Sequence, residues 1–158
     1  MNKIAVFPGS FDPFTIGHNS IVDRAIALFD KIIIAIGYND SKQGFFPIEK
    51  RKLWIEHIFK NQPSVEVQIY NGLTIDFCIS NKSNFILRGL RTSSDFEYER
   101  AIAQVNKLLN SNIETIYMLT LPEHTAISSS LVREVIKYKG DTSKFVPKII
   151  ADEIKKMM

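Results

Sequence analysis

Five short apolar runs alternate along this chain with stretches of helical periodicity, and no other feature constrains the fold as strongly. The runs lie at residues 4–7, 32–36, 65–70, 85–87 and 115–119. Helices are expected near residues 19–29, 47–59, 74–80, 94–109, 129–137 and 147–158. Strands and helices that alternate in this way build right-handed βαβ units. The sequence therefore predicts an α/β, Rossmann-like fold, with helices on both faces of a doubly wound, parallel, five-stranded sheet.

Length, charge and cysteine content narrow the class of protein. A chain of 158 residues is long enough to bury a core on both faces of one sheet, so we expect a single domain over residues 1–158. Basic residues exceed acidic ones by only three and form no block, which argues against a nucleic-acid partner. No run has the length of a membrane span, too few residues precede Pro8 for a signal peptide, and Cys78 has no cysteine partner. We expect a cytoplasmic protein that binds no membrane.

The segment 8–18 joins the first apolar run to the first helical stretch, and its composition is typical of an anion-binding loop. Gly9 and Gly17 allow the backbone to approach a ligand closely. Gly17 and His18 stand at the start of a helix, where unpaired N–H groups and a partial positive charge attract phosphate oxygens. Ser10 adds a hydroxyl and His18 an imidazole. Each residue alone is more simply a turn or a cap, but together they indicate a phosphate site.

Polar residues also follow the other apolar runs, and the carboxyl ends of parallel strands meet at one edge of the sheet. Lys42 follows the second run, where a solvated loop lysine is the simpler interpretation, and Thr74 follows the third, where a helix cap is as good an explanation as a ligand contact. Arg88 and Arg91 come directly after the fourth run, and phosphate binding is favoured there over a structural ion pair. Glu99, on the next helix, is placed to orient an arginine or a nucleotide group.

Three consecutive serines, Ser128, Ser129 and Ser130, begin the helical stretch after the fifth run. One serine would be only an N-cap, but three of them in a second strand-to-helix turn suggest a cradle for a polyphosphate. The chain contains neither the P-loop pattern nor the dinucleotide-binding glycine fingerprint. Its three histidines are scattered and no cysteine pair occurs, so we expect no metal site built from side chains.

In this order, the motifs resemble those of the nucleotidyltransferase superfamily, which carries an early T/HxGH motif, here Thr15 to His18, and a late ISSS/T motif, here Ile127 to Ser130. Within that superfamily the chain is similar to the bacterial phosphopantetheine adenylyltransferases over essentially its whole length. The segment from Arg88 to Glu99 is the part that distinguishes this family from its cousins.

The resemblance implies that the adenylyl group of ATP is transferred to 4′-phosphopantetheine, giving dephospho-coenzyme A and pyrophosphate, with Mg²⁺ carried on the nucleotide. It implies direct in-line attack without a covalent enzyme intermediate, and assembly as a homohexamer. Catalytic roles are implied for His18, Lys42 and Arg91, and acceptor contacts for Ser10, Lys42, Thr74 and Arg88. ATP contacts are implied for Ser10, Phe11, His18, Gly89, Leu90, Arg91, Glu99, His124, Thr125, Ala126, Ile127, Ser128, Ser129 and Ser130.

Two alternatives stay open at this point. A nicotinamide mononucleotide adenylyltransferase, or a cytidylyltransferase acting on a small phosphorylated alcohol, shares the early histidine motif, although the segment 88–99 and the three serines argue against both. A regulatory module that holds ATP without turning it over belongs to another class. Such a module would not require His18 and the two arginines to converge on one phosphate.

Overall fold

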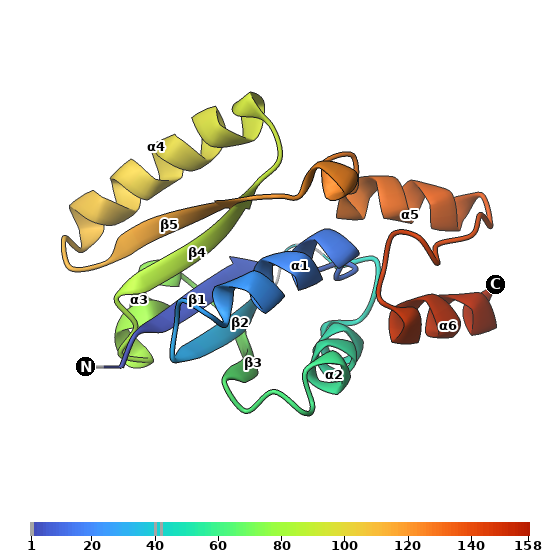
Figure 1. Ribbon diagram of the computed structural model, residues 1–158, viewed down its shortest axis with the longest axis horizontal. Helices are drawn as coiled ribbons and strands as arrows, with labels where there is room; N and C mark the ends of the chain where they lie inside the picture. The colour runs from blue at the N-terminus through green and yellow to red at the C-terminus, as the bar shows by residue number, and fades with distance from the viewer. Residues whose placement is uncertain (1, 40, 42) are drawn as a thin grey trace.

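The computed structural model describes residues 2–39, 41 and 43–158, and it contains the alternation of strands and helices that the sequence predicts (Figure 1). The strands are β1 (Ile4–Gly9), β2 (Lys31–Gly37), β3 (Val65–Tyr70), β4 (Phe85–Leu90) and β5 (Glu114–Leu119). The helices are α1 (Ile16–Ala25), α2 (Ile48–Ile58), α3 (Thr74–Ser80), α4 (Ser93–Leu109), the 3₁₀ turn η1 (Pro122–His124), α5 (Ser129–Lys137) and α6 (Lys148–Met157). None of the helices in the described part of the chain is both long and apolar enough to cross a membrane.

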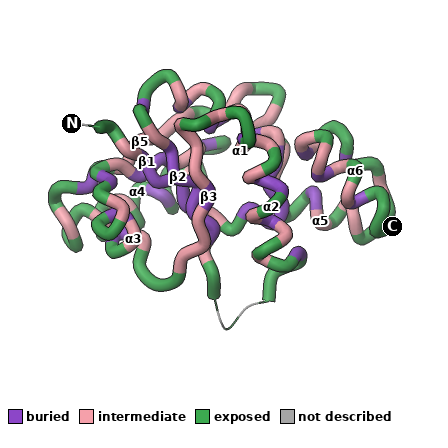
Figure 2. The backbone as a smooth tube through the Cα atoms, turned by 90° about the horizontal axis from the view of Figure 1, so that it is seen from below, coloured by how far each residue is buried: buried purple, intermediate pink, exposed green. Residues whose placement is uncertain are grey.

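All strands pair in parallel, in the order β3-β2-β1-β4-β5, and this confirms the predicted fold class. Successive strand residues point to opposite faces, so each strand supplies two cores. Ala5 and Phe7 of β1 pack into the core that α1 covers, whereas Val6 packs with Ile75 and Cys78 of α3. Figure 2 shows α1 and α2 on one side of the buried strands and α3 and α4 on the other.

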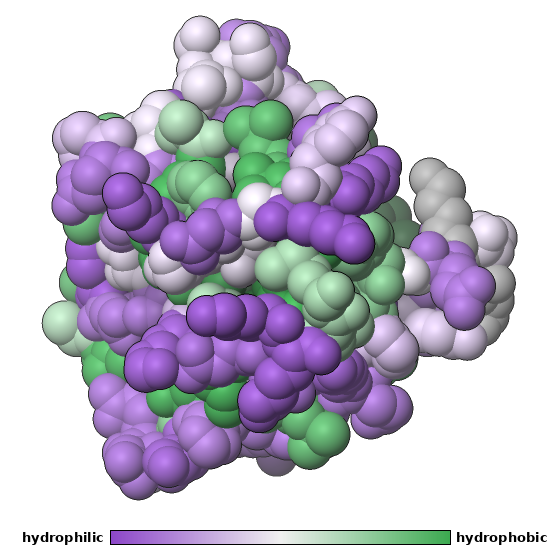
Figure 3. Space-filling model, turned by 90° about the vertical axis from the view of Figure 1, so that its right-hand side faces the viewer, coloured by the Kyte–Doolittle hydropathy of each residue, from purple (hydrophilic) through white to green (hydrophobic). Residues whose placement is uncertain are grey.

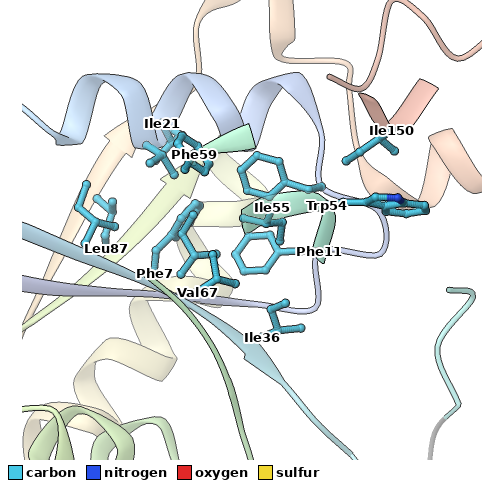
Figure 4. Close-up of a cluster of buried hydrophobic side chains, with 14 of the residues drawn as sticks. Phe7, Phe11, Ile21, Ile36, Trp54, Ile55, Phe59, Val67, Leu87 and Ile150 are labelled. Carbon is cyan, nitrogen blue, oxygen red and sulfur yellow. The ribbon is translucent and has the colours of Figure 1, made fainter. Parts of the chain in front are cut away.

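The larger core extends from the sheet to the C-terminal helix. Phe7 and Phe11 lie beneath α1, and Trp54 reaches from α2 toward Ile150 of α6 (Figure 4). The rings of Phe7 and Phe11 meet edge to face at 5.2 Å between centroids. The loop that follows β1 is thus anchored in the core by an aromatic side chain, although its backbone lies at the edge of the sheet.

Several element boundaries differ from the predicted ones by a few residues, and two of these differences bear on the site, each for a local reason. The first helix begins at Ile16, earlier than expected, because the Thr15 hydroxyl accepts a hydrogen bond from the His18 backbone and caps it. Strand β4 continues past the apolar run to Leu90, because its last residues pair with β5. Arg88 therefore lies within the strand and not after it, whereas Arg91 follows the strand directly.

Strands β1 and β4 separate before they end, and this opens the sheet at its carboxyl edge. Strand β1 pairs with β2 as far as Gly9, but with β4 only at Ala5 and Val6. Pro8 has no N–H group to donate to a ladder. The side chain of Arg88 instead donates to the Pro8 carbonyl. The strand order reverses between β1 and β4, and ligands of open parallel sheets bind at such a switch point.

Gly9→Ala is expected to destabilise the fold by about 1–3 kcal/mol through overpacking. A Cβ at Gly9 would lie 2.9 Å from Cζ of the Phe11 ring, which is buried and has little room to move. Gly17→Ala is the matched control, because its Cβ would meet no atom closer than 3.5 Å and alanine favours a helix. Denaturant unfolding of both variants measures the difference, and equal stabilities would contradict the predicted clash.

Candidate active site

Two cavities open at the carboxyl edge of the sheet. The first, called the wide cavity, has a volume of about 510 Å³ and lies between the starts of α1, α4 and α5. The second, called the narrow cavity, has a volume of about 200 Å³ and is lined by residues of α4 and of the sheet. Both are lined by Pro8, Gly9, Arg88 and Glu99, so the two spaces meet at the point where β1 and β4 diverge. In Figure 3, which views the end of the molecule that carries α5 and α6, hydrophilic side chains surround smaller apolar areas.

Many of the residues predicted from the sequence line the wide cavity together. They are Ser10, Phe11, His18, Arg88, Gly89, Arg91, Glu99, Ile127, Ser128, Ser129 and Ser130. These residues come from segments far apart in the chain, as expected for loops that share the carboxyl edge of a parallel sheet. Gly9 also lines this cavity, but a side chain at Gly9 would clash with the Phe11 ring. Packing therefore explains the glycine as well as close approach of a ligand does.

The remaining predicted residues lie elsewhere. Thr74 lines the narrow cavity, where its hydroxyl is 2.9 Å from the Tyr70 hydroxyl; it does not cap α3, because Leu73 occupies the N-cap position. His124 lines a separate hollow beside α1. Within the described chain, neither cavity has Leu90, Thr125 or Ala126 in its lining. Lys42 lies outside the described residues, so its role stays a prediction.

His18 is held at the start of α1 in a defined orientation. Its ring Nδ1 accepts a hydrogen bond from the Thr15 backbone N–H at 3.0 Å, which completes a capping box with the bond from the His18 N–H to the Thr15 hydroxyl. Because Nδ1 is an acceptor, we assign the ring proton to Nε2. The ring packs against Phe11 and Phe14, with centroids 5.0 and 5.4 Å away. His18 therefore offers one N–H donor, in fixed orientation, in the lining of the wide cavity.

The environment of His18 keeps the ring uncharged. Burial, reinforced by the positive charges of Arg88 and Arg91, lowers its pKa from 6.5 to about 3. A neutral imidazole at physiological pH is a hydrogen-bond donor through Nε2, and it has no proton that it readily releases. His18 is therefore suited to stabilise negative charge by donating a hydrogen bond, and it is not suited to act as a general acid.

Arg88 in β4 and Arg91 directly after it are both oriented by carboxylates. Arg88 donates through Nε to Glu99 at 2.9 Å and through Nη2 to the second oxygen of the same carboxylate. Arg91 pairs with Asp95 at 3.2 Å. Each arginine thus forms the structural ion pair that the sequence analysis ranked behind phosphate binding. Since Arg88 uses three of its five N–H donors on Glu99 and the Pro8 carbonyl, two donors are left for an anion.

The hydroxyls of the three serines, which were expected to join backbone N–H groups in a phosphate cradle, all have partners within the protein. The Ser128 hydroxyl caps α5 by accepting from the Leu131 N–H, and the Ser129 hydroxyl donates to the Pro13 carbonyl at 2.8 Å. The Ser130 hydroxyl lies 3.2 Å from an Arg133 guanidinium nitrogen. The donors that α5 offers to an anion are therefore mainly the N–H groups of its first turn.

Sequence reasoning missed three polar residues that shape the site. Arg133 lines the wide cavity and donates to the Asp12 carbonyl at 2.7 Å. Asp12 and Arg51 are buried, each 7% exposed, and they hold the loop after β1 against the segment before α2. Two signals were available in the sequence: Asp12 is an acid among aromatic residues, and Arg133 lies three residues after Ser130 and so shares its side of the helix.

This arrangement is suited to binding anions and not to covalent catalysis. Glu99 and Asp95, the carboxylates in the lining of the wide cavity, are both paired with arginines. In residues 2–39, 41 and 43–158, no group of three histidine, cysteine or acidic side chains lies close enough to hold a metal ion.

Comparison with known proteins shows that this chain is similar to nucleotidyltransferases over most of its length. A family model described as cytidylyltransferase-like matches residues 6–135. A phosphopantetheine adenylyltransferase of Flavobacterium psychrophilum is 54% identical over 146 residues, which cover 92% of this chain and 96% of that protein. One from Leuconostoc citreum is 46% identical over 157 residues, or 99% of each chain. The solved structure of Plasmodium falciparum nicotinic acid mononucleotide adenylyltransferase complexed with NaAD has the same fold, with a TM-score of 0.72 at 17% identity over 99% of this chain and 96% of that one.

The free energy of unfolding is expected to fall as the pH is lowered from 7 to 5, in part because of His18. The unfolded state, with a His18 pKa near 6.5, binds more protons in this range than the folded state, whose pKa is about 3. At pH 5 this proton binding lowers the free energy of unfolding by roughly 2 kcal/mol relative to its value at neutral pH. His18→Asn keeps an acceptor for the Thr15 N–H but does not titrate, so it should lose less stability over the same range. Denaturant unfolding at both pH values tests this, and identical losses in the two proteins would contradict it.

Proposed function

Since this chain belongs to the cytidylyltransferase-like nucleotidyltransferases, and within them to the phosphopantetheine adenylyltransferases, we propose that it transfers the adenylyl group of ATP to 4′-phosphopantetheine. The products are dephospho-coenzyme A and pyrophosphate, and the reaction is a step of coenzyme A biosynthesis. The observation that carries the proposal is the pair of cavities that meet at Arg88. A transfer between two substrates needs two adjoining sites with cationic groups where the phosphates meet.

The wide cavity suits ATP. The first residues of α1 and α5 line it, and the N–H groups of these helix starts attract phosphate oxygens. Arg91 and His18, with its Nε2 donor, also line it. Magnesium would enter as part of the nucleotide substrate. This agrees with the chemistry of the lining, because the carboxylates of Glu99 and Asp95 are already engaged by arginines and the triphosphate supplies the oxygens that Mg²⁺ prefers.

The narrow cavity suits the pantetheine arm of the acceptor. Its walls include the apolar side chains Ile86, Ile102 and Ala103, and the hydroxyls of Tyr70 and Thr74 lie among them. An amide-containing arm fits a site that is mostly apolar with a few polar groups. The acceptor phosphate would then lie near Arg88, where the two cavities meet, and this matches the role that the resemblance implies for that residue.

The proposed reaction is a direct in-line transfer. An oxygen of the acceptor phosphate attacks the α-phosphorus of ATP, the bond between that phosphorus and the oxygen bridging to the β-phosphate breaks, and pyrophosphate leaves with the bonding electrons. The acceptor phosphate is already a nucleophile, so positioning and charge neutralisation are sufficient. His18 donates its Nε2 proton as a hydrogen bond to an α-phosphate oxygen, and Arg91 and Lys42 neutralise charge.

The proposal includes assembly as a homohexamer, and the surface of α4 supports contact between subunits. Glu99 is the buried residue of this 17-residue helix. Val105, Leu108 and Leu109, near the C-terminal end of the helix, are 55%, 88% and 55% exposed. Apolar side chains grouped in this way on one helix mark a surface that a partner covers. A second copy of the chain would bury it.

The decisive experiment measures pyrophosphate release from ATP and Mg²⁺ with 4′-phosphopantetheine, with nicotinamide mononucleotide, or with no acceptor, and identifies the product by mass. Release with phosphopantetheine alone, together with the mass of dephospho-coenzyme A, is the expected result. Turnover with nicotinamide mononucleotide instead would replace the proposed acceptor. ATP binding without release under any condition would favour the regulatory module.

His18→Ala is expected to lower kcat by about 100- to 1,000-fold, because it removes a donor to the charge that develops in the transition state. The dissociation constant for ATP should change much less, since α5 and Arg91 are untouched. His57→Ala, at an exposed histidine of α2, is the control and should retain normal kinetics. Steady-state kinetics and calorimetric ATP titration measure the two effects, and nearly normal turnover in His18→Ala would eliminate its proposed role.

Leu108→Glu is expected to break the assembly into smaller species, because it places a charge in the middle of the exposed apolar surface of α4. Leu53→Glu is the control, since Leu53 is also exposed, at 64%, but lies on α2. Light scattering coupled to size-exclusion chromatography reports the mass of each protein. A hexamer that persists in folded Leu108→Glu would show that the subunits meet through another surface.

A further inference from the structure

Arg51 is a buried cation outside both cavities, yet its side chain contacts the segments that border them. From α2 it donates through Nη1 to the Ser10 carbonyl at 2.6 Å and through Nε to the Phe46 carbonyl at 3.0 Å. The same Nε lies 3.9 Å from an oxygen of the Asp12 carboxylate. Neither the proposed catalytic roles nor the proposed substrate contacts account for an arginine at this position.

Asp12 completes the connection. Its two carboxylate oxygens accept from the backbone N–H groups of Phe45 and Phe46, at 2.6 and 2.9 Å. The pair thereby joins the loop after β1 to the segment before α2. The chain passes so closely over the pair that a Cβ at Gly44 would lie 2.8 Å from Arg51 Nη2 and 3.0 Å from Asp12 Oδ2.

The residue between these contacts has an unusual backbone. Phe11 has a φ of 47°, in the left-handed region that side chains other than glycine rarely adopt. Such a conformation persists only where the surroundings hold it on several sides. Here the carbonyl of Ser10 and the carboxylate of Asp12, directly before and after Phe11, are both held by the same buried network.

The direction of the Ser10–Phe11 peptide follows from this contact. In a trans peptide the C=O and the next N–H point in opposite directions. Because Arg51 binds the Ser10 carbonyl from the side of α2, the Phe11 N–H points away from α2. Ser10 and Phe11 both line the wide cavity, whereas Arg51 does not.

We propose that Arg51 and Asp12 form a positioning pair, which holds the left-handed turn at Phe11 so that the Ser10 hydroxyl and the Phe11 N–H are presented to the phosphates of the bound nucleotide. This inference rests on the proposed function. Buried ion pairs contribute little net stability compared with apolar residues of the same size, but they select one arrangement of the groups that they bind. The pair acts through the turn and does not touch the substrate.

The kinetic test compares Arg51→Met and Arg51→Lys with the matched control Arg24→Met. Arg24 also donates to two backbone carbonyls, those of Ser20 and Leu119, but it lies outside both cavities. Loss of the planar fork should lower kcat about 10- to 100-fold in Arg51→Met. The KM for ATP should stay within about threefold of the wild-type value, because the contacts from α5 remain. Arg51→Lys keeps the charge but not the fork and should also be impaired, whereas Arg24→Met should match the wild type.

A second variant and a second measurement separate positioning from loss of folding. Gly44→Ala keeps both charged groups and crowds them, so it should lower kcat as Arg51→Met does. In the ligand-free proteins, amide hydrogen exchange should become faster in residues 10–12 and 43–46 of the Arg51 variants and of Gly44→Ala, with the strands unchanged.

The outcomes distinguish the inference from the proposed function. Wild-type kcat in folded Arg51→Met, or in Gly44→Ala if Arg51→Met does not fold, overturns the positioning pair. Unchanged exchange in residues 10–12 of these variants overturns it as well. If the wild type shows no adenylyl transfer while exchange still rises in the variants, the proposed function fails but the structural part of the inference stands.

Discussion

The geometry of the site depends on hydrogen bonds to the carbonyl groups at the end of β1 and in the loop that follows it. Four of these carbonyls accept from side chains that lie between 41 and 121 residues away along the chain. The donors are Arg88 to Pro8, Arg51 to Ser10, Arg133 to Asp12 and Ser129 to Pro13. A loop at the edge of a sheet would ordinarily leave such groups to water. Here they connect β4, α2 and α5 to one short segment and so fix the position of the loop on several sides.

Burial, with the charges of two neighbouring arginines, keeps the histidine of the site neutral. Arg88 and Arg91 add to the effect of burial in lowering the pKa of His18, so the ring stays neutral in a site that gathers positive charge. Glu99 and Asp95 orient the guanidinium groups and limit the repulsion between them. A neutral donor beside two oriented cations suits a reaction in which negative charge builds up on phosphate oxygens but no proton needs to be moved. Each hydrogen bond from a charged donor contributes about 1.5–3 kcal/mol, which favours the anion in the site over the same anion hydrated in bulk water.

The fold and the general position of the site were predictable, and the internal contacts of the site were not. Buried parallel strands are continuously apolar, so runs such as residues 32–36 identify the strands directly. The end of β4 was missed because Arg88 and Gly89 do not look like strand residues, and only pairing with β5 extends it. The partners of the serine hydroxyls and the role of Arg51 depend on contacts across the tertiary structure, for which local sequence carries no signal. His124 was assigned to the nucleotide site from the family resemblance, and the structure places it in the lining of the hollow beside α1.

A proline in the central strand links the fold to its chemistry. Proline is normally excluded from such a position because it cannot donate to the ladder. Pro8 lies beyond the short part of β1 that pairs with β4, so the sheet loses no bond that its neighbour needs. The gap that results is filled by the guanidinium of Arg88, which binds the Pro8 carbonyl on one side and Glu99 on the other. The two cavities meet at this guanidinium. A defect in strand pairing at the switch point of the sheet thus makes room for both cavities and for the cation at their junction, without any insertion into the fold.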